Sequence, residues 1–287
     1  MDPAFFMNRN FQRISVLGGG VLGGSIVLAL RNKADLRLWI RRPEAVEAAQ
    51  ASGIDCATGD LAEAVSGAEL VILAVPVGAM PDLLEKAIAA GLPADCVVTD
   101  VGSVKQTPHR SLASVLEKSG NPFIGSHPMA GSEQNGLSAA RAGLFDKAAC
   151  LLTNDSGASD DLCGALEAFW KQLGCRTFWV GATEHDELVA RISHLPHITA
   201  AATAKISLKD PALGQFGGGG LRDTTRVASG NPVMWAEILM ENREAVIPAL
   251  RETLTELREI LASLESPDQE LVHRWLSGAK ELRDTLP

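Results

Sequence analysis

The apolar residues of the first 180 positions form short continuous runs, and segments with helical periodicity separate several of them. Helical patterns over 21–30 and 43–51 follow the first two runs. The runs predict buried strands over 14–17, 36–40, 70–75, 96–100, 123–126, 149–153 and 176–180. Continuous apolar strands are typical of a parallel sheet that is covered on both faces. Because these strands alternate with helices, the pattern predicts a doubly wound α/β sheet.

The strand pattern ends near residue 182, and long helical tracts replace it. Five leucines of these tracts recur at heptad-like spacing: Leu250, Leu254, Leu257, Leu261 and Leu264. Such a stripe is typical of a helix core or of a subunit interface. We therefore expect an α/β domain over 13–182 and an all-helical domain over 183–287. Residues 1–12 are expected to be a leader and a disordered N-terminus.

Composition narrows the class of protein. A length of 287 residues with 46% hydrophobic content suits two domains with a substantial core. The net charge of −9 argues against a nucleic-acid partner, and no apolar run is long enough to predict a membrane span. The five cysteines are widely spaced and form no CxxC pair. This spacing favours a cytoplasmic location for the protein, and it predicts neither a disulfide framework nor a metal site.

A glycine-rich segment follows the first predicted strand and opens the first predicted helix. Gly18, Gly20 and Gly23 form a GxGxxG fingerprint, in which the glycines allow a tight turn, close approach of a pyrophosphate and close helix–strand packing. Val21 and Leu22 lie in the first helical turn, where free N–H groups favour an anion. The segment predicts a dinucleotide-binding site.

The end of the second strand bears on the choice of dinucleotide. An NAD site usually has an acidic residue there, but this strand is followed by Arg41 and Arg42, and Asp35 precedes it. Two guanidinium groups suit a 2′-phosphate, so NADP is favoured. NAD remains the alternative, with an arginine stacked on the adenine. Val75 and Pro76, at the end of the third run, are further cofactor-binding candidates.

The strand over 96–100 leads into a second polar segment that contains Asp100, Ser103 and Lys105. Ligands bind at the carboxyl ends of strands in open α/β sheets, so Asp100 is a cofactor-binding candidate. Ser103 is either a partner for a substrate hydroxyl or a helix N-cap. Lys105 either attracts an anionic substrate or is an exposed charge.

A histidine with a titratable ring lies at the start of the glycine-rich segment 125–136. His127 follows the small residues at the end of a predicted strand and precedes a proline. A loop of this composition positions a side chain without filling the space before it. Together with the fingerprint, His127 points to a redox enzyme in which the imidazole faces a nicotinamide ring.

The helical half contains further candidates for substrate binding. His194 and His197 are three positions apart and can share a helix face, either as ligand-binding or as packing residues. No further metal ligands at suitable spacing accompany them. Arg226 follows a glycine-rich bend, where it either binds a carboxylate in bidentate fashion or pairs with Asp223.

Five motifs occur in one order along the chain: Gly18-x-Gly20-x-x-Gly23, Asp100-Val-Gly-Ser103-Val-Lys105, Gly125-Ser-His127-Pro-Met-Ala-Gly131, Ser193-His194-Leu-Pro-His197 and Arg222-Asp-Thr-Thr-Arg226. With them the chain resembles the prephenate/arogenate dehydrogenases of tyrosine biosynthesis from about Ile14 to its end. The resemblance implies a Rossmann-type domain joined to an all-helical domain that forms a homodimer, with active sites between the domains. It also implies oxidative decarboxylation of prephenate to 4-hydroxyphenylpyruvate.

The resemblance assigns roles to individual residues. His127 matches the catalytic histidine that takes the proton of the ring 4-hydroxyl, and Ser103 matches a serine on the same hydroxyl. Arg226 matches an arginine that binds a substrate carboxylate. His197 matches a histidine near the substrate side chain, and His194 is its neighbour. Three other histidines match none of these roles: His109, His185 and His273.

Three alternatives remain. The first is an arogenate dehydrogenase or a dual-specificity cyclohexadienyl dehydrogenase, in which Glu133, in the loop that borders the pocket of relatives, would face the substrate amine. His197 suits the keto acid equally well, and prephenate is favoured. The second is a β-hydroxyacid dehydrogenase, which would carry a catalytic lysine on the helix after the domain boundary, with glycines before it. The first lysine after the boundary is Lys205, and no glycine lies between Gly181 and Lys205. A non-enzymatic dinucleotide sensor would not need His127, His197 and Arg226 together.

Overall fold

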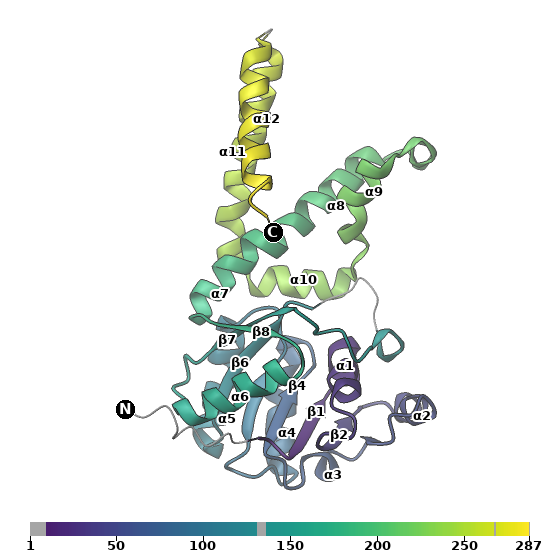
Figure 1. Ribbon diagram of the computed structural model, residues 1–287, viewed down its shortest axis with the longest axis vertical. Coiled ribbons are helices and arrows are strands. Elements are labelled where there is room, and N and C mark those ends of the chain that lie inside the picture. The colour runs from purple at the N-terminus through teal and green to yellow at the C-terminus, as the bar shows by residue number, and fades with distance from the viewer. Residues whose placement is uncertain (1–9, 131–135, 267, 287) are drawn as a thin grey trace.

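The computed structural model describes residues 10–130, 136–266 and 268–286, and it has an α/β part and a helical part (Figure 1). The helical part stands over one edge of the sheet, and its yellow C-terminal segment forms an arm that projects away from the sheet. Residues 1–9, which make up most of the expected leader, lie outside the described residues.

The α/β part is built on one eight-stranded sheet with the order β3-β2-β1-β4-β5-β6-β7-β8. Its strands are β1 (Arg13–Leu17), β2 (Asp35–Trp39), β3 (Ala57–Thr58), β4 (Leu70–Leu73), β5 (Val97–Asp100), β6 (Phe123–Pro128), β7 (Ala149–Thr153) and β8 (Arg176–Trp179). Neighbouring strands are parallel except β6 and β7. The doubly wound sheet is therefore confirmed, and the short strand β3 is an addition to the predicted set.

Helices cover both faces of this sheet, which explains the continuous apolar runs. The helices are α1 (Val21–Ala29), α2 (Pro43–Ala51), α3 (Leu61–Val65), α4 (Met80–Ala89), α5 (Gln106–Ser119) and α6 (Asp160–Gln172). Along β4, Leu70 and Ile72 belong to the core cluster that includes residues of α1, α2 and α6. Val71 and Leu73 belong to the second cluster, with residues of α3, α4 and α5. Successive side chains thus enter opposite cores, as strand geometry requires.

Beyond Trp179, every regular element of the described residues is helical, as expected. The elements are α7 (Ala182–Val189), the π-helical segment η4 (Ala190–His194), α8 (Leu195–Ser207), η5 (Pro211–Phe216), α9 (Gly219–Thr225), η6 (Arg226–Ser229), α10 (Pro232–Glu241), α11 (Arg243–Glu265) and α12 (Gln269–Arg283). Helices α11 and α12 lie side by side in the projecting arm (Figure 1). Within the described ranges, no helix combines the length and the apolar character needed to cross a bilayer.

Candidate active site

The glycine loop lies between β1 and β4, where the strand order reverses. Gly18 has a φ of +131°, and a Cβ there would lie 2.2 Å from the carbonyl oxygen of Ala74. A Cβ on Gly23 would lie 2.0 Å from the carbonyl oxygen of Gly18. By contrast, a Cβ on Gly20 would meet nothing within 4 Å. The loop is thus tightly packed from behind and open in front at the start of α1, where a pyrophosphate would lie.

The ends of the neighbouring strands lie against this loop. The N–H of Gly18 donates to the carbonyl of Trp39 at the end of β2, at 3.0 Å. A Cβ on Gly18 would lie 3.1 Å from Val75, which follows β4. Pro76 is exposed, and two residues on, the N–H of Gly78 donates to Glu237 of α10 at 3.1 Å. The structure therefore brings the candidate cofactor residues after β1 and β4 together beneath the helical part.

The acidic residue of β2 lies at its amino end, and two basic residues follow its carboxyl end. Asp35 lies at the amino end, where Arg13 and Arg37 pair with it at 2.8 and 2.6 Å. Arg41 and Arg42 follow the carboxyl end, next to the glycine loop, and both are exposed. No carboxylate of β2 itself is placed to meet a ribose at the loop, since its acidic residue is at the opposite end.

Lys105 and Asp100 form an ion pair with no exposed side-chain surface, and the Nζ–Oδ2 distance is 2.5 Å. The carboxylate of Asp100 also accepts the N–H groups of Gly102 and Ser126, at 2.8 and 3.2 Å. Both side chains are therefore used within the protein, and this placement favours a supporting role beneath the site for the two residues. Ser103 is half-buried in the bend between β5 and α5.

His127 lies in β6, all of whose residues are buried, and is itself 8% exposed. Its Nδ1 lies 2.9 Å from Nε2 of His185, and Nδ1 of His185 lies 2.8 Å from Oδ1 of Asp186. Burial is the largest cause that holds the pKa of His127 well below its ordinary value, and the nearby charge of Lys105 acts in the same direction. The imidazole is therefore neutral at pH 7 and is able to accept a proton.

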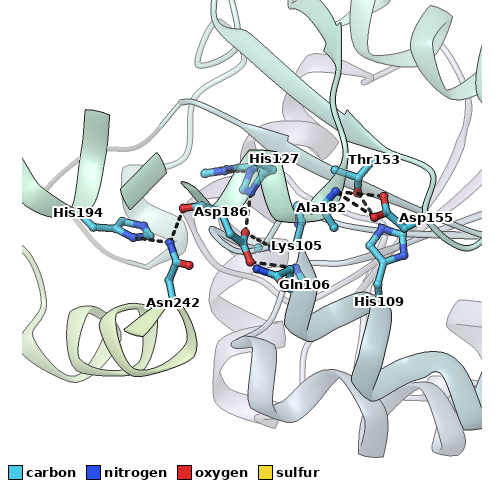
Figure 2. Close-up of polar contacts among 12 residues, drawn as sticks. Lys105, Gln106, His109, His127, Thr153, Asp155, Ala182, Asp186, His194 and Asn242 are labelled. Carbon is cyan, nitrogen blue, oxygen red and sulfur yellow. Dashed lines mark hydrogen bonds and ion pairs between the residues drawn. The ribbon is translucent and has the colours of Figure 1, made fainter. Parts of the chain in front are cut away.

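Asp186, on α7, ties the helical part to the α/β part. Its carboxylate accepts the N–H groups of Lys105 and Gln106, at 2.7 and 3.0 Å, at the start of α5 (Figure 2). An acidic group at a helix N-terminus satisfies free N–H groups and matches the helix dipole. The Asp186 carbonyl accepts from the amide of Asn242, which also lies 3.0 Å from Nδ1 of His194 (Figure 2).

The two predicted histidines of the helical part lie close together, on either side of the junction between η4 and α8. A π-helical turn such as η4 shifts the register of a helix and is frequent at functional sites. Burial lowers the pKa of His194 to about 4. His197 stacks on Trp235 with a centroid separation of 3.6 Å, and burial lowers its pKa, against the opposing effect of the Val227 carbonyl.

Arg226 is the first residue of η6, which packs against α8. It is exposed, and its neighbour Val227 is the residue whose carbonyl approaches His197. The structure thus brings Arg226, His197 and Trp235 to one region. Glu133 lies outside the described residues.

Sequence reasoning missed two residues of this site, His185 and Asp186. His185 has no exposed surface and joins His127 to the carboxylate of Asp186. The signal in the sequence was the density of His185, Asp186, His194 and His197 within one helical stretch. In the part of the chain that the structure describes, no group of three or more histidine, cysteine or acidic residues is arranged to hold a metal ion.

Comparison with known proteins identifies the family. The family model "Prephenate dehydrogenase, nucleotide-binding domain" matches residues 27–179, and "Prephenate dehydrogenase, dimerization domain" matches residues 181–278. Prephenate dehydrogenase of Bacillus subtilis is 33% identical over 98% of this chain and 78% of its own length. Cyclohexadienyl dehydrogenase of Zymomonas mobilis is 31% identical over 95% of both chains.

A solved structure agrees with these matches. Prephenate dehydrogenase from A. aeolicus, in complex with hydroxyphenyl propionate and NAD+, has a TM-score of 0.83 and 29% identity. The alignment covers 95% of this chain and 97% of that one. The chain therefore belongs to the prephenate dehydrogenase family of dinucleotide-dependent oxidoreductases.

Proposed function

We propose that the protein converts prephenate to 4-hydroxyphenylpyruvate with NADP+ as the hydride acceptor and His127 as the base. The observation that carries the proposal is the neutral, buried imidazole of His127 at the junction of the two domains. A base of this kind removes the proton of an alcohol as the alcohol is oxidised. The open space at Gly20 supports the binding of a dinucleotide beside β4.

The electron and proton movements of this reaction require little from the protein besides a base and correct positioning. When bound, the oxidised dinucleotide supplies the acceptor for the hydride of ring C4. His127 takes the proton of the 4-hydroxyl, and the oxygen becomes a carbonyl. The bond to the ring carboxylate then breaks, CO2 leaves, and its electron pair reaches the carbonyl oxygen as the ring becomes aromatic. His127 can return its proton to that oxygen.

Arg226 is the proposed partner of a substrate carboxylate. Its place in η6, against the helix that carries His197, supports this role. Replacing Arg226 with alanine is expected to raise the KM for prephenate by about 10- to 100-fold, the usual contribution of a hydrogen-bonded charge pair. Steady-state kinetics measures this, and Arg222→Ala, an exposed arginine of the same motif, is the matched control. An unchanged KM in Arg226→Ala would leave Arg226 with a structural role only.

Arg41 and Arg42 support the preference for NADP+. They follow the carboxyl end of β2, and the acidic residue of that strand is paired at its other end. In the Arg41→Ala/Arg42→Ala variant, the ratio of kcat/KM for NADP+ to that for NAD+ is expected to fall by about 10- to 100-fold. Arg37→Ala, on the same strand, should leave the ratio unchanged. A wild-type enzyme that prefers NAD+ would contradict this assignment.

A second substrate deserves the same assay. The Zymomonas mobilis relative is named a cyclohexadienyl dehydrogenase, which favours acceptance of arogenate as well as prephenate. The two substrates differ only where an amine replaces the keto group, so His197 and Glu133 are the residues proposed to distinguish them.

We also propose that the protein is a homodimer through its helical domain. The stripe on α11 supports this, because Leu254, Leu257, Leu261 and Leu264 are 43–66% exposed in the single chain. The match to a family model described as a dimerization domain supports it too. The free thiols of the five cysteines suit the reducing cytoplasm, which is the proposed location.

A further inference from the structure

We propose that His185 and Asp186 set the tautomer of His127, holding the hydrogen on its Nδ1 and leaving Nε2 as the nitrogen that accepts the substrate proton. The proposal deepens the proposed function and rests on His127 being the base. His185 and Asp186 act through His127 and are therefore positioning residues.

The carboxylate of Asp186 is buried, with 1% of the residue exposed. Oδ1 accepts from the N–H of Lys105 at 2.7 Å, and Oδ2 accepts from the N–H of Gln106 at 3.0 Å. Both oxygens of the carboxylate therefore accept from backbone N–H groups. A carboxylate has only lone pairs to offer. Because Nδ1 of His185 lies 2.8 Å from Oδ1, that nitrogen must carry the hydrogen of the contact.

The position of the hydrogen on His185 determines the position of the hydrogen on His127. Burial lowers the pKa of His185, so its ring is neutral near pH 7 and has a single hydrogen. With that hydrogen on Nδ1, Nε2 of His185 has a lone pair directed at Nδ1 of His127, 2.9 Å away. His127 must therefore donate from Nδ1. Since His127 is neutral as well, its Nε2 is left with the lone pair.

The opposite arrangement is disfavoured on electrostatic grounds. A hydrogen on Nε2 of His127 would place two nitrogen lone pairs 2.9 Å apart, or would require a doubly protonated His185 in a site with no exposed surface. The hydrogen bonds from His127 through His185 to Asp186 also stabilise the protonated His127 that forms during turnover. When His127 is protonated, its Nδ1–H remains paired and the carboxylate of Asp186 lies one ring away, as in other enzymes in which an acid orients a histidine base.

Residues of several elements fix the hydrogen-bonded series Asp186–His185–His127. The Asp186 carbonyl accepts from Asn242 at 2.8 Å, and its carboxylate is fixed by the start of α5. His185 itself has no exposed surface. These contacts leave the His185 ring little freedom to turn away from His127.

Two substitutions of His185 separate this role from packing. In His185→Gln, the amide oxygen can occupy the position of Nε2 and accept from His127, while the NH2 donates to Asp186. In His185→Asn, the shorter amide reaches Asp186 but leaves Nδ1 of His127 without an acceptor. Both variants lose the aromatic ring but differ by one methylene, so the midpoint of thermal unfolding is measured beside kcat to identify any loss that comes from packing. We expect kcat to fall by about 10- to 100-fold in His185→Asn and to be largely retained in His185→Gln.

The tautomer is also directly observable in the folded protein without substrate. In ¹⁵N-histidine-labelled protein, two-bond ¹H–¹⁵N correlation spectra at neutral pH should show His127 protonated on Nδ1 and bare on Nε2. In His185→Asn, the population of the other tautomer should rise. Wild-type His127 protonated on Nε2, or equal kcat in the two variants, would overturn the proposal.

These measurements also distinguish a failure of the tautomer proposal from a failure of the proposed function. A His127→Asn variant with full turnover would refute His127 as the base, whatever the spectra show. Loss of turnover in His127→Asn, together with the wrong tautomer in the wild type, would refute only the role of His185 and Asp186.

Discussion

Replacement of His127 with asparagine is expected to lower kcat by about 10²- to 10⁴-fold, which is the contribution of a positioned base to proton transfer. Asparagine has a polar group near the position of Nδ1, so the contact with His185 can persist, but it has no basic nitrogen. The fold should therefore survive while the proton of the substrate hydroxyl loses its acceptor. Steady-state kcat and KM, measured beside the midpoint of thermal unfolding, separate these effects.

His109 provides the matched control. Its ring nitrogens lie 2.7 Å from the hydroxyl of Ser156 and 2.8 Å from that of Thr153, so both are engaged within the α/β part. Burial lowers its pKa as well. His109→Asn should keep a kcat close to that of the wild type. Near wild-type turnover in His127→Asn would remove His127 from the mechanism.

The second large effect is expected on stability. Replacing Lys105 with methionine should lower the free energy of unfolding by about 3–5 kcal/mol, because removal of one partner leaves a buried charge uncompensated. Here the remaining charge is Asp100, which like Lys105 has no exposed surface. The two N–H donors from Gly102 and Ser126 remain, but they do not replace an ammonium. Denaturant unfolding at neutral pH measures the loss.

Two further variants test the cause of that loss. Lys86→Met removes an exposed pair with Asp82 at 3.1 Å and should change the free energy by less than about 1 kcal/mol. Combining Lys105→Met with Asp100→Asn removes the orphaned charge and should recover part of the stability. A Lys105→Met protein that is as stable as the wild type but has a raised KM would favour the other role of Lys105, attraction of an anionic substrate.

Much of the fold follows from the local pattern of the sequence. Most strands of the sheet are short apolar runs that helices cover on both faces, so the sequence predicts both their type and their burial. Strand β8 is the exception, because Arg176, Phe178 and Trp179 are exposed where a buried strand is predicted. The strand β3 has only two residues, Ala57 and Thr58, and it exists because β2 offers an edge to pair with. Pairing of this kind depends on tertiary structure and leaves no periodic signal.

The site was less predictable because its contacts span long distances in the sequence. His127 and His185 are 58 positions apart, and nothing in the residues around either shows that their rings meet. Lys105 has the sequence context of a surface charge, and only its packing against Asp100 makes it a buried one. By contrast, the glycine fingerprint was predictable because its conformational and steric requirements are local.

The most direct test of the account is the formation of reduced cofactor by the purified protein, with prephenate or arogenate offered in combination with NADP+ or NAD+. We expect turnover of prephenate, with NADP+ preferred over NAD+. Turnover with NAD+ alone would retain the enzyme and contradict the role given to Arg41 and Arg42. Tight binding of a dinucleotide with no turnover of either substrate would contradict the central claim and would favour a non-enzymatic sensor.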